Sequence, residues 1–346
     1  MKKALSLILI LLILISLVSC SNSSKNVAIT CGSTTVSGEI FYSQLLNYKN
    51  EFLISYLGLT EDNPAIWSQD SPTGRLETMG EALTRMAVED MTQFAWVIEY
   101  AKDNGVTIDE ENKKGIEEAV ASLKENFETE EEYKEYLTTL KLDDESLNTY
   151  LEYTILYDEG FRLLTGEGGP YALTEEDYKE YYEKNFYTVK HIFVNNVSKV
   201  GEDGEEVPLT EDEIKEKEDK AKGILDALDK GEDFETHYLF SEDQMAVSYP
   251  DGITIADGFT YDTAYESTAK ALKEGEYKMV NGTSGGIYII LRLPLSESDY
   301  EEYKSYVQTV VNQEVTTRIY SDCKNDVTVN YDVINSYPIE EIPILD

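Results

Sequence analysis

The chain holds only two histidines, and one of them lies where an imidazole can do chemistry. His191 falls within residues 189–194, a short run rich in β-branched and aromatic residues that predicts a buried strand. An imidazole on such a strand can donate and accept hydrogen bonds and can change charge near neutral pH. Two interpretations stay open, a satisfied core residue and a functional group. The other histidine, His237, follows a helix joint and is expected to be structural or exposed.

The cysteines and histidines do not form a metal-binding pattern. The three cysteines are Cys20, Cys31 and Cys323, and no two of them have the close spacing of a zinc site. We therefore expect no metal and no cofactor. Cys31 and Cys323 lie near the two ends of the folded part. They could form a disulfide if these ends pack together, but two buried free thiols are the favoured interpretation.

Two further segments complete the group around His191. Residues 240–243 read Phe-Ser-Glu-Asp, and residues 285–293 form an apolar strand entered through two glycines. Between these segments and the first strand lie a helix at 221–230, a Gly-x-x-Phe joint at 231–234 and a helix stop at 271–276. In order and spacing, residues 189–293 resemble the parvulin-type prolyl isomerases.

This resemblance assigns roles to five residues. It implies His191, Asp243 and Tyr288 as catalytic residues, and Tyr261 and Tyr265 as the pair that grips the proline ring. Three positions depart from the family pattern: the two gripping residues are commonly Met and Phe, and Tyr288 stands where the family has a second histidine. A tyrosine keeps a flat apolar face and a hydroxyl group, but it does not reproduce a pair of imidazoles.

Each of these assignments has a structural alternative. Asp243 can instead cap a turn beside Ser241. The three tyrosines can be ordinary core aromatics among the 26 tyrosines of the chain.

The chemistry implied by the resemblance needs no covalent intermediate. Rotation about an Xaa-Pro bond must break partial double-bond character, a barrier of roughly 18 to 20 kcal/mol. An apolar slot lowers this barrier when it holds the proline ring, excludes water and fits the twisted amide better than the planar one. Polar groups around the slot then hydrogen-bond the carbonyl and the prolyl nitrogen as conjugation is lost.

The N-terminal segment predicts export. Two lysines are followed by an uncharged apolar run at residues 4–18, which is short for a membrane span and typical of a secretory leader. Residues 17–20, Leu-Val-Ser-Cys, resemble a bacterial lipobox. The resemblance implies a leader at 1–19, a lipid on Cys20 and a linker to residue 26, so the protein is expected outside the cytoplasm on the bacterial cell membrane. An ordinary cleaved signal peptide is the alternative.

The formal net charge of −39 limits the partners. Such a field repels nucleic acid, so no nucleic-acid ligand is expected. Most of the carboxylates are expected to lie on solvated helix faces.

The remaining pattern predicts an α+β protein of mainly helical character. We expect a helical chaperone domain at 27–186, a parvulin-like α/β domain with a small antiparallel sheet at 187–294, and a C-terminal helix and strand at 295–346 that pack on the first domain. Capping boxes starting at Thr107, Thr129 and Thr210 mark helix starts. Residues 327–331 predict an edge strand, and the tail from Pro338 is expected to be loose. This layout resembles the PrsA-like and SurA-like extracytoplasmic foldases.

The resemblance implies a membrane-anchored foldase that assists secreted proteins and isomerises their Xaa-Pro bonds. Its partners would be unfolded or proline-containing polypeptides, and a homodimer stays open. The alternative is a non-catalytic holdase or peptide-binding lipoprotein with a vestigial parvulin domain. A solute-binding lipoprotein finds little support, because the helical bulk shows no pair of α/β lobes.

Overall fold

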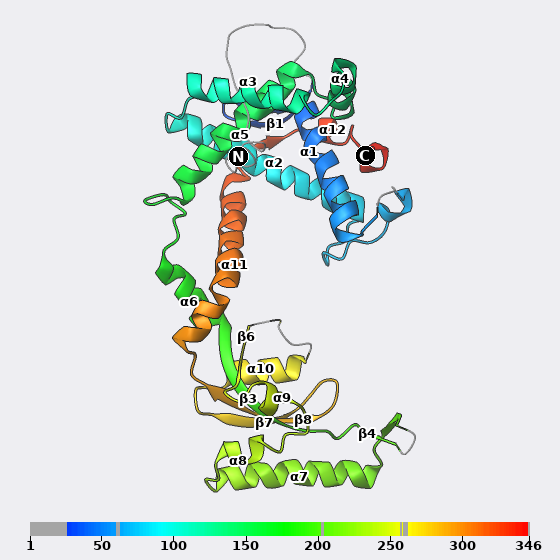
Figure 1. Cartoon of the computed structure of the whole chain (residues 1–346), viewed down its shortest axis with the longest axis vertical. Helices are drawn as coiled ribbons and strands as arrows, with labels where there is room; N and C mark the ends of the chain where they lie inside the picture. The colour runs from blue at the N-terminus through cyan, green and yellow to red at the C-terminus, as the bar shows by residue number, and fades with distance from the viewer. Residues whose placement is uncertain (1–25, 60–62, 202–203, 257, 259–261, 345–346) are drawn as a thin grey trace. The chain divides into compact units, whose positions relative to one another are not determined.

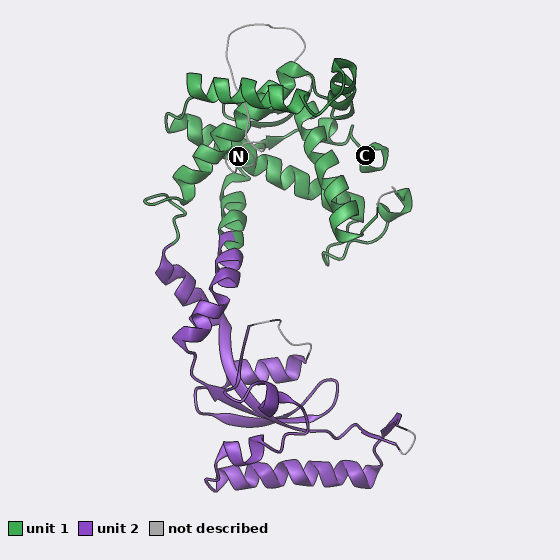
Figure 2. Ribbon diagram, viewed as in Figure 1, with its two compact units in different colours: residues 1–173, 313–346 green, residues 174–312 purple. Residues whose placement is uncertain are grey.

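The computed structural model describes residues 26–59, 63–201, 204–256, 258 and 262–344. It divides into two compact units, unit 1 (1–173 with 313–346) and unit 2 (174–312), shown in Figure 2. Helices and small antiparallel sheets make up both, which confirms the predicted α+β class. The predicted leader, Cys20 and Tyr261 lie outside the described residues.

Unit 1 joins the two ends of the chain in one small sheet. Its strands are β1 (Val27–Cys31), β2 (Thr34–Ser37) and β9 (Thr328–Val329), and β1 lies in the middle. The β1–β2 hairpin turns at Gly32, whose φ of 52° is easily reached by glycine. Strand β9 pairs antiparallel with β1 at the opposite edge, with Ile29 facing Val329. The edge strand predicted near residues 327–331 is therefore present.

Helices form the bulk of unit 1 (Figure 1). They are α1 (Gly38–Glu51), the π-helical turn η2 (Phe52–Tyr56), the 3-10 turn η3 (Pro64–Ile66), α2 (Met79–Asp103), α3 (Glu110–Lys124), α4 (Glu130–Thr139), α5 (Asp144–Thr165), α12 (Tyr331–Ile334) and the 3-10 turn η4 (Ile339–Glu341). Helix α2 is central, because it packs against α1, α5 and the β1–β2 hairpin. Alanines on its buried face, Ala87, Ala95 and Ala101, let these neighbours approach closely.

Local capping chemistry sets most helix starts. The predicted boxes at Thr129 and Thr210 are present, and each hydroxyl accepts a hydrogen bond from the amide three residues on. The box predicted at Thr107 is wrong: helix α3 is capped by Asp109, which accepts from the amides of Glu111 and Asn112. A carboxylate so placed satisfies two orphan amides and also faces the positive end of the helix dipole.

The C-terminal tail is packed into unit 1, which corrects the expectation that it is loose from Pro338 onward. Ile339 and Ile342 are buried in the main core. The fully buried ammonium of Lys49 donates to their carbonyl oxygens at 2.9 and 2.6 Å and lies 5.1 Å from the centre of the Trp67 ring. These hydrogen bonds hold the tail in place, because a buried cation or carbonyl group without a partner costs free energy.

We expect Lys49→Met to destabilise unit 1 by about 2 to 4 kcal/mol, because the apolar volume is kept while two buried carbonyls lose a charged donor. Urea unfolding gives the change in free energy, and hydrogen exchange reports whether residues 339–342 open. Lys114→Met is the matched control, since that ammonium pairs with Glu118 at an exposed surface. Equal effects of the two substitutions would contradict a tail held by Lys49.

Unit 2 is built around a four-stranded antiparallel sheet in the order β6-β3-β8-β7. The strands are β3 (Phe186–Val194), β6 (Ile253–Ala256), β7 (Tyr277–Asn281) and β8 (Ile287–Leu293). The other elements are α6 (Glu175–Asn185), the ribbon of β4 (Ser198–Val200) and β5 (Glu206–Pro208), α7 (Glu211–Asp229), α8 (Phe234–Tyr238), α9 (Met245–Ser248), α10 (Thr263–Ala271) and the start of α11 (Glu297–Cys323).

Helices cover both faces of this sheet. Helix α10 packs on the face that carries Val189 and Ile290, and α7 and α8 pack on the face that carries Ile192 and Ile289 (Figure 1). Successive residues of β3 therefore pack into two different hydrophobic cores, because side chains alternate between the two faces of a strand. His191 shares the α10 face with Val189.

The unit boundaries lie at 173/174 and 312/313, where the sequence predicted 186/187 and 294/295. Helix α6 and the first part of α11 belong to unit 2 because they share an aromatic cluster. The ring of Tyr182 lies 4.9 Å from that of Phe186 and 5.4 Å from that of Tyr300.

Candidate active site

His191 is held by hydrogen bonds on both ring nitrogens. Its Nε2 lies 2.6 Å from Oδ2 of Asp243, and its Nδ1 lies 2.8 Å from the hydroxyl of Tyr265. The three residues come from strand β3, the turn before α9 and helix α10. The His191 side chain is 11% exposed, so two ordered partners replace most of its water.

The charge of Asp243 fixes the tautomer of His191. Burial raises the pKa of this carboxyl group, but hydrogen bonds from His191 and Ser241 outweigh it and leave the pKa below its usual value. Asp243 is therefore ionised at neutral pH and only accepts hydrogen bonds. In the neutral imidazole, Nε2 then carries the proton and donates to Asp243, while Nδ1 accepts from the hydroxyl of Tyr265.

Asp243 also caps a turn, as the structural alternative for it predicted. Its other oxygen, Oδ1, accepts from the hydroxyl of Ser241 at 2.7 Å and from the amide of Met245 at 3.1 Å. Ser241 in turn accepts from the amide of Phe193 at 2.8 Å. The turn is thereby fastened to the strand that carries His191.

A second set of contacts joins the turn at Asp243 to strand β3. The amide of Glu242 donates to the carbonyl of Phe193 at 2.9 Å, and the Glu242 carboxylate pairs with Lys217 and Lys220 of helix α7. Sequence reasoning missed Glu242 and these lysines, because their contact depends on how α7 packs beside the turn.

Tyr288 completes the cluster from strand β8. Its ring lies edge-to-face with His191 at 5.3 Å and with Tyr265 at 5.1 Å, and it stands opposite Phe193 in the strand register, with ring centres 4.9 Å apart. The entry to β8 needs glycine: at Gly286, with φ of 86°, a Cβ would lie 2.2 Å from the Phe193 ring.

The structure thus brings together four of the five residues named from the sequence, His191, Asp243, Tyr265 and Tyr288. The fifth, Tyr261, is not described. Tyr265 differs in its surroundings from a residue that grips a ligand, because it is 5% exposed and its hydroxyl is used by His191. Burial also raises its pKa, so the phenol stays protonated as a donor. His237 is separate from this cluster and bonds Glu232 at 3.1 Å.

We expect Asp243→Asn to destabilise unit 2 at neutral pH by about 1.5 to 3 kcal/mol, the size of a charge-assisted hydrogen-bond set. A carboxyl group whose pKa is lowered by folding contributes stability above its unfolded pKa, near 4, and loses it as the pH falls through the folded value. The difference between wild type and Asp243→Asn should therefore shrink below about pH 4. Urea unfolding at pH 7, 5 and 3 measures it, and a difference independent of pH would contradict the assignment of charge to Asp243.

Other chemistry-bearing residues in the described part of the chain form no metal centre, since no three of the His, Cys, Asp and Glu side chains there are placed to hold an ion. Cys31 and Cys323 are buried free thiols. Burial is the largest cause that raises the pKa of each, and for Cys323 the value reaches about 12. Neither thiol is therefore activated as a nucleophile. Among the described helices, none has the length and apolarity needed to cross a bilayer.

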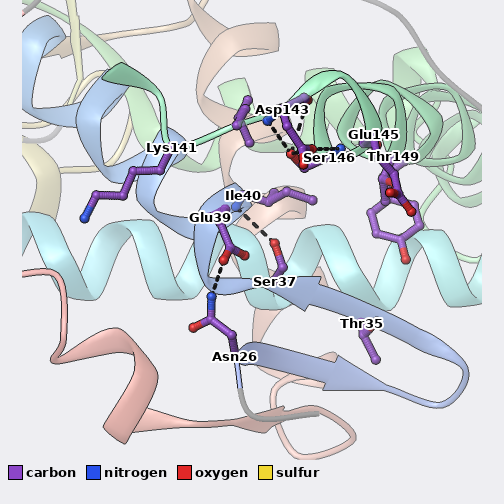
Figure 3. A pocket seen from close by; sticks show the side chains of 12 residues that line it. Asn26, Thr35, Ser37, Glu39, Ile40, Lys141, Asp143, Glu145, Ser146 and Thr149 are labelled. Atoms are coloured by element: carbon purple, nitrogen blue, oxygen red, sulfur yellow. Dashed lines mark hydrogen bonds between the residues drawn. The ribbon is translucent and has the colours of Figure 1, made fainter. Parts of the chain in front are cut away.

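A polar pocket of about 700 Å³ opens in unit 1 beside the N-terminal ends of α1 and α5 (Figure 3). Two of its polar side chains cap those helices. Ser37 accepts from the amide of Ile40 at 3.3 Å, and Asp143 accepts from the amide of Ser146 at 2.8 Å. These contacts explain Ser37 and Asp143 as helix caps.

The chain was compared with protein families, curated proteins and solved structures. No protein-family model and no curated protein matches the chain. Solved structures do match. Among them are foldase protein PrsA from Streptococcus pneumoniae (18% identity, covering 80% of this chain and 94% of that one, TM-score 0.27), peptidylprolyl isomerase PrsA from Bacillus cereus (21% identity, 94% and 95%, TM-score 0.31) and PrsA from Bacillus subtilis (19% identity, 78% and 90%, TM-score 0.26). The chain is similar to these structures at low identity and low TM-score.

Proposed function

We propose that this protein is a lipid-anchored foldase outside the cytoplasm, which assists the folding of secreted proteins and isomerises their Xaa-Pro bonds in unit 2. The single observation that carries the isomerase proposal is the imidazole of His191, fixed between Asp243 and Tyr265 with the ring of Tyr288 against it. The leader pattern and the lipobox-like Cys20 support the anchor and the compartment.

The proposed mechanism uses fixed dipoles and apolar walls. Because Asp243 and Tyr265 set the imidazole before a peptide binds, the polar groups need no reorganisation when the amide twists. The rings of Phe193 and Tyr288 supply apolar surface beside it. A twisted amide loses conjugation, and the lone pair of its nitrogen becomes localised. Groups arranged for the twisted state stabilise it relative to the planar ground state and so speed rotation.

The test is a proline-limited refolding assay with the purified protein. We expect the slow refolding phase of a client with an Xaa-Pro bond to accelerate in proportion to the protein added, and a short Xaa-Pro peptide to isomerise faster as well. Suppression of client aggregation is followed in parallel. Unchanged slow phases for both substrates would remove the isomerase proposal, and unchanged aggregation would remove the chaperone role.

A non-catalytic holdase is the second candidate. It is favoured because neighbouring side chains surround the imidazole of His191 and occupy its polar atoms. Two tyrosine rings contact the imidazole, and Tyr265 occupies its Nδ1. If the unit is vestigial, Tyr288→His should raise isomerisation about tenfold or more, since it restores the missing imidazole, and aggregation suppression should stay the same. A wild type already faster than Tyr288→His would contradict the vestigial reading.

A further inference from the structure

Unit 1 has another pocket besides the polar one at the starts of α1 and α5, and it lies far in sequence from His191. A pocket of about 530 Å³ forms where the end of α1 and the π-helical turn η2 face residues 71–73 and the first turns of α2. Its lining is mainly apolar and includes Phe52, Tyr56, Met79, Leu83 and Met86. A pocket of this size holds a single long side chain with its neighbours.

The walls of this pocket expose side chains that a folded protein usually covers. Tyr56 is 80% exposed and Met86 is 40% exposed, yet Tyr56 stacks on Phe52 with ring centres 6.0 Å apart. The π-helical turn places both rings on the pocket, and such turns are frequent at functional sites. Methionine is flexible and polarisable, so it adapts to ligands of varied shape. Aromatic and thioether surface of this kind is typical of a binding face.

A carboxylate lies in the same pocket. Asp90 of α2 accepts a hydrogen bond from the hydroxyl of Tyr48 through Oδ2. In the part of the chain that the structure describes, its Oδ1 takes no hydrogen bond. Asp90 remains open to solvent, while the surrounding protein atoms raise its pKa by desolvation.

We propose that this pocket binds a lysine or arginine side chain of an unfolded polypeptide, with the methylene stem against Tyr56 and Met86 and the cation on Asp90. The stem would cover apolar surface, and the cation would take the open oxygen of Asp90. A neutral apolar side chain would leave Oδ1 of Asp90 without a partner, and an acidic one would be repelled. The net charge of −39 draws basic segments toward the protein from a distance.

This inference goes beyond the proposed isomerase. It uses residues of unit 1 only and no group near His191, so it can hold when isomerisation is absent. It assigns the foldase a preference for segments in which a basic residue is flanked by apolar ones.

The experiment measures peptide binding to the purified protein by fluorescence anisotropy. The probe is a labelled hexapeptide with one lysine between leucine and phenylalanine, and matched peptides carry norleucine or glutamate in place of lysine. We expect the lysine peptide to bind about tenfold more tightly than the norleucine peptide, the range of a charge-assisted hydrogen bond. Asp90→Asn should weaken only the lysine peptide, by a similar factor.

Two further variants sharpen the result. Met86→Lys places an internal ammonium four residues before Asp90 on α2, within reach of its carboxylate, and should block the lysine peptide by occupying the site. Asp158→Asn is the control, because it removes the same charge from a different pocket of unit 1. Equal binding of lysine and norleucine peptides would overturn the proposal, and so would an equal loss in Asp90→Asn and Asp158→Asn. A lost peptide response in the wild type with retained isomerase activity would overturn it and leave the proposed function intact.

Discussion

We expect His191→Ala to lower kcat/KM for Xaa-Pro isomerisation about 10- to 100-fold, or about 1.4 to 2.8 kcal/mol of transition-state stabilisation. Truncation removes the imidazole and also frees its two partners. Asp243 then becomes a partly buried carboxylate with one fewer donor, and the Tyr265 hydroxyl loses its acceptor. A peptide assay under conditions where the uncatalysed rate is subtracted gives kcat/KM directly.

The other histidine of the chain supplies the control. His237 bonds Glu232 in unit 2 and lies outside the cluster, so His237→Ala should leave kcat/KM within twofold of wild type. Thermal unfolding of both variants separates lost chemistry from lost folding. If His191→Ala retains full activity in a folded protein, or if both substitutions reduce activity equally, His191 has no role in the reaction.

The sequence could predict the two strands of this site because strand periodicity acts locally, whereas the grouping of their residues with Asp243 and Tyr265 followed from the family resemblance. Residues of β3 and β8 alternate between two faces, so a pattern that places His191 and Tyr288 on strands already limits which side chains they can meet. The turn at Ser241 and Asp243 was also readable, since short polar side chains before a helix cap it. The hydrogen bond from Tyr265 could not be predicted, because it depends on how α10 docks on the sheet.

The same difference between local and distant contacts explains which parts of the fold could be predicted. Helix starts at Thr129 and Thr210 follow from residues within one turn, and the structure confirms them. The burial of Ile339 and Ile342 depends on Lys49, which lies nearly the whole chain away in sequence, and no local pattern signals that contact. Unit 2 begins at 174, before the predicted domain boundary, for a similar reason, since α6 joins it through the packing of Tyr182 on Tyr300.

We expect Gly160→Ala to destabilise unit 1 by about 3 kcal/mol. Helices α2 and α5 pack closely along their length, and at Gly160 a Cβ would lie 2.5 Å from the carbonyl oxygen of Val97 and 3.0 Å from the Cβ of Ala101. The nearest atom belongs to the backbone of a central helix, so it cannot rotate away. Relief requires α5 to shift from α2, which also disturbs Val97 and Leu164 in their buried cluster.

Helix α3 offers the matched control for Gly160→Ala. Gly115 also lies within a helix, but a Cβ there would meet no atom within 4 Å. Gly115→Ala should therefore stabilise the protein by about 0.5 to 1 kcal/mol, because alanine loses less backbone entropy on folding. Urea unfolding of the two variants should move in opposite directions from wild type. Stabilisation by both substitutions would mean that helix propensity, and not the close approach of α2 and α5, decides the effect at Gly160.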